Sequence, residues 1–241
     1  MPYYYYGFDW TYVILVLPCL LLSLWASANV NSTFRRYSTQ YSYRNLTGAE
    51  AAQRVLAANG VTGVRIERIS GNLTDHFDPR SNVIRLSDNV YGNTSTAAIG
   101  VACHEAGHAV QYAVGYAPIK LRAAIIPITN FGSKLAMPLI LLGLVLETFG
   151  QFSYLLIYIG IACFALSLMF QLVTLPVEFN ASHRALVAID QNGLLTEDEQ
   201  KGARKTLRAA ALTYVAATAV SLAQLLRLLV LFGGRGRRRN D

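Results

Sequence analysis

The sequence is poor in charged residues and in cysteine. Charged side chains make up 15% of the 241 residues and hydrophobic ones 53%, whereas about 25% is charged in a typical soluble domain. Intrinsic disorder, which needs high charge and low hydrophobicity, is excluded. The three cysteines lie in apolar or helical runs, so no disulfide framework is predicted. The composition indicates a chain that is partly inside a membrane and partly outside it.

Acidic residues are also scarce, which leaves a net charge of +7. A basic balance is typical either of nucleic-acid binding or of the cytoplasmic flanks of membrane helices. We predict the second because of the apolar composition. The lipid bilayer is therefore an expected partner and nucleic acid is not, while the oligomeric state stays open.

The first apolar run, residues 11–30, contains no charge and is long enough as a helix to cross a hydrocarbon core of about 30 Å. A cleaved signal peptide is the alternative, because Ala26-Ser27-Ala28 resembles a cleavage site. The first ten residues, however, contain Asp9 and neither Lys nor Arg. A retained membrane anchor is therefore predicted, with its cytoplasmic end at Arg35 and Arg36.

Local signals outside this run predict a small mixed portion. Thr47 to Glu50 is a capping-box pattern whose helix should end near Asn59. Residues 64–69 and 82–87 alternate like strands, and a further helix should begin near Asn93 or Ser95. The predicted fold is thus predominantly α: a multi-span membrane protein of about four transmembrane helices with a small α+β portion.

Later in the chain, the uncharged runs 135–146 and 154–175 predict a helical membrane hairpin. Pro176 should lie in the first turn of a new helix. A fourth crossing would place the basic tail at residues 235–239 outside the cell, against the usual bias. The last helix could instead be buried in protein or lie in the interface. The predicted segments are an anchor (1–30), a mixed extramembrane portion (31–117), a membrane hairpin (118–175), a polar connection (176–208) and a last helix with the basic tail (209–241).

The chemistry is concentrated in His104-Glu105-Ala106-Gly107-His108. Positions i and i+4 of a helix share one face, so both imidazoles can bind one Zn²⁺. Glu105 stands where it can take a proton from a metal-bound water. Two of only four histidines fall at this spacing, with a glutamate in the required place. One zinc per chain is therefore the predicted cofactor.

A catalytic zinc needs a third protein ligand. Glu178 is the first candidate, because the hairpin returns it to the side of the membrane that holds the histidines. His183 is the rival ligand, and it could also donate a hydrogen bond to the reacting carbonyl group. Nearby Asn180 is a candidate for supporting a ligand or the substrate.

Asp75-His76-Phe77-Asp78-Pro79 groups two carboxylates and a histidine. Asp75, His76 and Asp78 could support the metal ligands, form a substrate-binding turn or hold a second metal. They could equally be a polar turn between two strands. The residues alone leave these alternatives open.

The chain resembles the YugP-like family of neutral zinc metallopeptidases of the bacterial membrane. The matching stretches are NSTFRRYS, TGAEAAQRVL, LTDHFDPRSNVIRLSDNVY, AIGVACHEAGHAVQYA, LPVEFNASHRA and ARKTLRAAALTYVAA. The resemblance implies that His104 and His108 bind zinc, that Glu105 is the catalytic acid and base, and that the 75–78 cluster does more than cap a turn. Glu178 is also similar to the glutamate ligand of HtpX-like membrane proteases. Their pattern has an aspartate four residues later, where this chain has Ser182.

These observations predict a multi-pass cell-membrane zinc endopeptidase whose catalytic portion faces the cytoplasm. A peptide or a membrane protein would be its substrate, held in extended form along the strand at 82–87 as a candidate sheet edge. A site-2-type intramembrane protease would need an Asp ligand in a later span, yet no Asp occurs between Asp88 and Asp190. The alternatives from other classes are a non-catalytic adaptor with a structural zinc and a protein that binds anionic lipid through residues 235–239.

Overall fold

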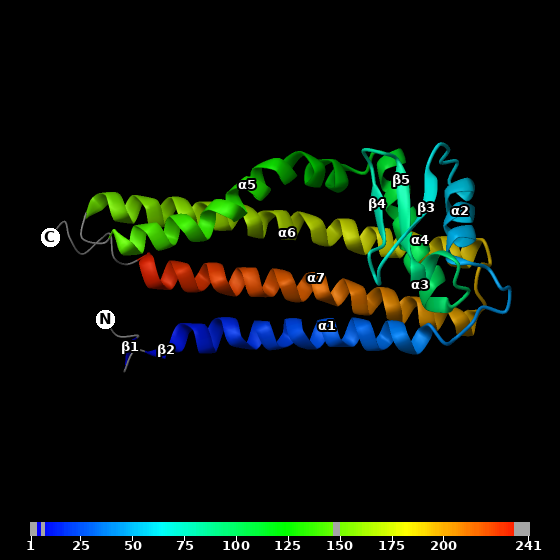
Figure 1. Cartoon of the computed structure of the whole chain (residues 1–241), viewed down its shortest axis with the longest axis horizontal. Coiled ribbons are helices and arrows are strands. Elements are labelled where there is room, and N and C mark those ends of the chain that lie inside the picture. Colours follow the sequence, from blue (N-terminus) through cyan, green and yellow to red (C-terminus); the bar gives the residue numbers. More distant parts are fainter. Residues whose placement is uncertain (1–3, 6–7, 147–149, 234–241) are drawn as a thin grey trace. The chain divides into compact units, whose positions relative to one another are not determined.

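The computed structural model describes residues 4–5, 8–146 and 150–233 (Figure 1), so the basic tail at 235–239 lies outside the described residues. The chain divides into two compact units. One, here called the membrane unit, comprises residues 1–25, 121–174 and 214–241. The other, the soluble unit, comprises residues 26–120 and 175–213. Each unit is thus assembled from segments that are far apart in the sequence.

The fold prediction is confirmed: the chain is predominantly helical, and four helices are long and apolar enough to cross a membrane. The first begins with a π-helical turn, η1 (Tyr12–Val16), and continues as α1 (Leu17–Tyr37). The others are α5 (Ala117–Val145), α6 (Gln151–Gln191) and α7 (Glu197–Phe232). Before them, β1 (Tyr4–Tyr5) pairs antiparallel with β2 (Phe8–Asp9).

Pro176 does not begin a new helix, contrary to the sequence-based prediction. It lies inside α6, which continues without a break from Gln151 to Gln191. A proline inside a helix removes one backbone hydrogen bond, and tertiary packing tolerates that loss here. α6 therefore carries an apolar membrane segment and the polar residues around Glu178 on one helix.

In the membrane unit, the interior joins α5, α6 and α7 through a cluster of buried residues: Ile140, Ile157, Ile161, Leu228 and Phe232. Polar contacts add to it. Gln171 donates to Ser221 Oγ at 2.7 Å, and Tyr158 donates to the carbonyl oxygen of Phe232 at 3.2 Å. Arg227 of α7, which interrupts the last apolar run, forms an ion pair with Asp9.

The sheet of the soluble unit has the order β3-β5-β4 and comprises β3 (Arg65–Ile69), β4 (His76–Asp78) and β5 (Val83–Ser87). β5 pairs in parallel with β3 and antiparallel with β4. The strand predicted at 82–87 is therefore central, and the prediction that it is a free edge was wrong. Residues 76–78, left open as a polar turn, form the edge strand β4 instead.

Helices α2 (Gly48–Ala58), α3 (Asp88–Tyr91) and α4 (Thr96–Ala113) pack with this sheet (Figure 1). The predicted capping box is present: Thr47 Oγ1 accepts from the Glu50 backbone, and the Glu50 side chain accepts from the Thr47 backbone. α4 is the central helix of this core, since fourteen of its residues are buried. A buried helix of this kind holds polar side chains only where they have partners.

Candidate metal centre

Two histidines project from one face of α4. The helix begins after Ser95, whose hydroxyl accepts from the backbone of Ala98. Because His104 and His108 are one helical turn apart, their rings lie edge to face, with centroids separated by 4.7 Å. The Nε2 atoms of both rings point toward the same carboxylate, that of Glu178 on α6.

Glu178 completes a three-donor set. Its Oε2 lies 3.3 Å from His104 Nε2 and 3.5 Å from His108 Nε2. The carboxylate is nearly buried, with 3% of its side chain exposed. Ligands about 2 Å from a tetrahedral zinc ion lie roughly 3.3 Å from one another. The spacing of these donors, and their identity as two imidazoles and a carboxylate, therefore fit zinc.

The approach of α6 to α4 depends on a residue without a side chain. Gly107 lies between the two histidines in the sequence, and the backbone of Ala181 packs directly against it. Ala181 is fully buried and lies one turn beyond Glu178. The glycine of the motif thus lets the two helices come close enough for Glu178 to reach both rings.

Each histidine also has a partner at its other ring nitrogen. Ser182 Oγ lies 3.1 Å from His104 Nδ1, and Gln111 Oε1 lies 3.0 Å from His108 Nδ1. Such partners fix the orientation of metal-binding imidazoles. Sequence reasoning missed Gln111, although a glutamine three residues after His108 on an apolar helix was a readable signal.

Glu105 is buried beside the histidines, with 8% of the residue exposed. Burial alone would lower the pKa of His108, but the hydrogen bond to Glu178 and the charges of Glu105 and Glu178 raise it above its ordinary value. The site therefore favours positive charge, as a cation-binding site must.

Asp75 lies close enough to Glu105 for their charges to interact. Burial raises the pKa of Asp75, and the charge of Glu105 adds to this effect, while hydrogen bonds from Ser87 oppose it. Its two carboxylate oxygens accept from the Ser87 backbone at 2.7 Å and from the Ser87 hydroxyl at 3.0 Å. Asp75 is thus tied to the end of β5.

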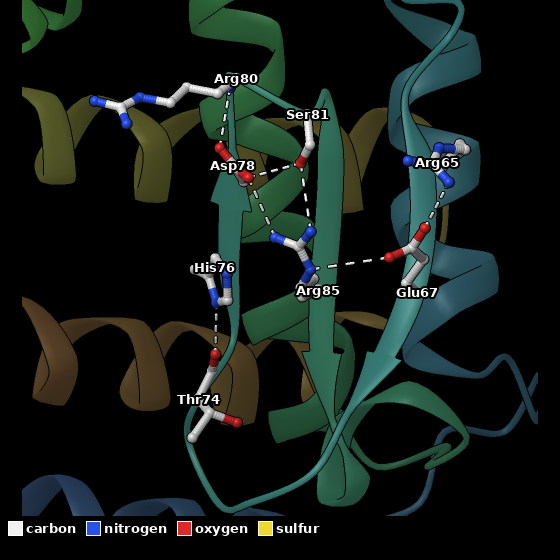
Figure 2. Close-up of polar contacts among 8 residues, drawn as sticks. All are labelled: Arg65, Glu67, Thr74, His76, Asp78, Arg80, Ser81 and Arg85. Carbon is white, nitrogen blue, oxygen red and sulfur yellow. Dashed lines mark hydrogen bonds and ion pairs between the residues drawn. The ribbon is translucent and has the colours of Figure 1, made fainter.

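The other two members of the cluster lie elsewhere. Figure 2 shows Asp78 in a polar network with Ser81 and Arg85, where Asp78 Oδ2 accepts from Ser81 Oγ at 2.6 Å and from Arg85 Nη1 at 3.3 Å. These bonds and that from the Arg80 backbone lower the pKa of Asp78 to about 2. His76 is exposed, and its Nδ1 lies 2.8 Å from the carbonyl oxygen of Thr74. Neither residue joins the three-donor set.

His183 and Asn180 are not members of the three-donor set. Both line a pocket of about 390 Å³ that also includes Asn59 at the C-terminal cap of α2, Val110 of α4 and Arg184 of α6. Asn180 Oδ1 accepts from Arg184 Nε at 2.8 Å and from Gln111 Nε2 at 3.0 Å. The structure thus groups Glu178, and not His183, with the two histidines of α4.

Comparison with known proteins points to zinc metallopeptidases as well. The chain is 45% identical over 221 residues to a Bacillus subtilis (strain 168) protein named "Putative membrane protease YugP", covering 92% of this chain and 96% of that relative. No solved structure matches the chain. The model of the family described as "Putative neutral zinc metallopeptidase" matches residues 12–233, and the chain therefore belongs to that family.

Proposed function

We propose that this protein is a membrane-bound zinc endopeptidase. One observation carries the proposal: His104, His108 and Glu178 bring three ligand atoms within 4.8 Å of one another on two helices of a single unit. Family membership and the name of the relative support the same activity. The site lies in α4 and in the part of α6 that belongs to the soluble unit.

In this proposal, the three side chains bind the metal through His104 Nε2, His108 Nε2 and a carboxylate oxygen of Glu178. Zinc bound in this way supplies a Lewis acid that makes water a usable nucleophile near neutral pH. The carboxylate of Glu105 accepts a proton from the attacking water and then donates it to the leaving amine of the peptide. Asp75 lies near Glu105 and is held there by the hydrogen bonds that its carboxylate accepts from Ser87.

Three protein ligands distinguish this site from a structural one. Structural zinc sites are closed by four protein ligands, whereas catalytic sites keep the fourth position for water. Among the described residues, the grouping around His104 contains three donors and no fourth. This number favours hydrolysis over an adaptor with a structural zinc.

We place the substrate along β4. In the described sheet, β4 pairs on one side only, with β5. It also packs on α4, where the rings of Phe77 and Tyr112 meet at a centroid distance of 5.6 Å. An extended peptide can add to such an edge through backbone hydrogen bonds. Because the chain is anchored in the bilayer, membrane proteins and peptides near the membrane are the proposed substrates.

The catalytic portion is proposed to face the cytoplasm. Arg35 and Arg36 lie in the last turn of the first spanning helix, inside the soluble unit, and basic residues mark cytoplasmic ends. The soluble unit adds further basic side chains at the start of the last spanning helix, including Lys201, Arg204 and Lys205. Accessibility labelling of cysteines introduced at exposed positions of this unit in intact cells tests this orientation.

The test of function is zinc content together with proteolysis. Detergent-purified wild type should contain about one zinc per chain, and Glu178→Ala should lose it. His183→Ala is the matched control, from the same stretch of α6, and should keep the metal. Glu105→Gln should also keep zinc, but it should no longer cleave fluorescent casein.

Each result has a defined meaning. Full zinc in Glu178→Ala with loss in His183→Ala would move the third ligand. Cleavage that continues after complete removal of zinc, or that survives Glu105→Gln, would overturn the peptidase mechanism. A cellular role that persists in Glu105→Gln but not in Glu178→Ala would favour the adaptor.

A further inference from the structure

Gln111 is a fully buried polar residue on the helix that carries the histidines. Its amide nitrogen donates to the backbone carbonyl oxygen of Val177 at 2.8 Å and to Asn180 Oδ1 at 3.0 Å. Its amide oxygen lies 3.0 Å from His108 Nδ1. One side chain thus connects α6 to a histidine of the metal centre.

These partners determine which way the amide points. The carbonyl oxygen of Val177 can only accept a hydrogen bond, so the NH₂ group of Gln111 must face it. The oxygen of Gln111 must then face His108. Because that oxygen can only accept, Nδ1 of His108 must carry the proton, and the lone pair of the neutral ring lies on Nε2, the atom that faces Glu178.

We infer that Gln111 is a positioning residue that holds His108 in the Nδ1–H tautomer and presents Nε2 to the metal. This inference rests on the proposed function and assigns a role to a residue that does not touch the metal. The carbonyl oxygen of Val177 on α6 fixes the orientation of the Gln111 amide. Val177 is next to the proposed ligand Glu178 in the sequence. Asn180, itself held by Arg184, supports the amide from the other side.

Packing alone does not account for a glutamine here. The site is fully buried, and methionine, of similar size and shape, would fill it without any cost of burying an amide. If Gln111 only filled space, Gln111→Met would weaken zinc binding slightly. Gln111→Glu would weaken it severely, because a carboxylate would lose both donated hydrogen bonds.

The positioning role predicts the opposite order for zinc affinity. Gln111→Glu keeps an acceptor opposite His108 Nδ1, with Arg184 close by to balance the charge, and should bind zinc within a few-fold of wild type. Gln111→Met has no acceptor and should bind zinc about 10–100-fold more weakly, the usual loss when an outer partner is removed. Competition with a chelator of known affinity measures both values.

A control separates this effect from general loss of stability. Thr96 is also fully buried on α4, and its hydroxyl lies 3.3 Å from the carbonyl oxygen of Tyr37. Thr96→Val removes a buried hydrogen bond far from the metal ligands, so it should lower the unfolding temperature and leave zinc affinity unchanged. Equal zinc affinity in Gln111→Met and wild type would overturn the inference.

A second readout does not require zinc. In metal-free Glu178→Ala, which lacks the carboxylate that competes for Nε2, nitrogen-15 NMR at alkaline pH should show His108 as the Nδ1–H tautomer. Adding Gln111→Met should shift it toward Nε2–H, with the signal assigned by its loss in His108→Ala. An unchanged tautomer would contradict the inference, whereas a wild type without zinc would contradict only the proposed function.

Discussion

A methyl group built on Gly107 of α4 would lie 2.7 Å from the backbone carbonyl oxygen of Ala181 on α6. That distance is well inside van der Waals contact, and the neighbouring atom is backbone, so it cannot move aside by a rotamer change. Gly107→Ala should therefore push α6 away from α4 and carry Glu178 away from the two histidines.

We expect Gly107→Ala to lower stability by about 1–3 kcal/mol, the usual cost of overpacking, and to weaken zinc binding at least as much as Gln111→Met does. Gly92→Ala is the matched control, because no atom lies within 4 Å of a methyl group at Gly92. Thermal unfolding and chelator competition measure the two effects. If Gly107→Ala binds zinc as tightly as wild type, the close contact between Gly107 and Ala181 does not determine the position of Glu178.

Ser182 provides the second prediction. Its hydroxyl is the partner of His104 Nδ1 at 3.1 Å, so Ser182→Ala should weaken zinc binding, roughly ten-fold, by releasing the ring. Ser182→Asp should restore or strengthen binding, because a carboxylate is a stronger acceptor for the imidazole N–H. Isothermal titration with zinc in detergent tests the order Asp, Ser, Ala. If alanine binds as tightly as serine, Ser182 does not orient the ring.

The third prediction concerns acid stability. Hydrogen bonds and Arg85 lower the pKa of Asp78 from 3.8 to about 2. A lowered carboxyl pKa adds stability that is complete above the unfolded-state pKa and is lost as the pH falls through the folded-state value. Asp78→Asn should therefore be less stable than wild type at neutral pH, and the difference should narrow between about pH 4 and pH 2. Chemical denaturation across this range measures it; a constant difference would contradict the assignment.

The fourth prediction concerns the ion pair between Asp9 and Arg227. Asp9 also accepts from Thr11 Oγ1 and from the backbone of Tyr12, so it holds the start of the first helix as well. Asp9→Asn and Arg227→Gln should each lower the unfolding temperature, because each leaves a partly buried charge without its partner. The double variant should lose less than the sum, by about 0.5–3 kcal/mol in a double-mutant cycle. Strict additivity would show that the pair contributes nothing.

Much of the fold could be predicted from local signals. Short local patterns were enough to predict several elements. These are the capping box at Thr47, the alternating strands at 65–69 and 83–87 and the apolar runs. Pro176 misled the prediction because a proline suits both a helix start and a tolerated interior position, and only packing decides between them. β4 was missed because its three residues become a strand through pairing with β5, which no local pattern encodes.

The site also has a part that local sequence predicts and a part that depends on long-range packing. The spacing of His104 and His108 placed both rings on one face, and the hairpin brought Glu178 back to them. The role of Ser182 could not be predicted, because its partner His104 lies 78 residues away. For Gln111 the contact with His108, three residues away, was readable, but the contact with Val177, 66 residues away, was not. Such contacts depend on the register of α4 against α6, which is set by the close approach at Gly107.

The Asp9–Arg227 contact has a consequence for biogenesis. The two residues are 218 positions apart, so a ribosome that adds about 5–20 residues per second finishes Arg227 roughly 10–45 s after Asp9. During that time the carboxylate is in place at the start of the first helix without its guanidinium. The partner of Asp9 is therefore made only after the other three apolar helices, and a nascent chain that stops short of α7 leaves the Asp9 carboxylate without its guanidinium.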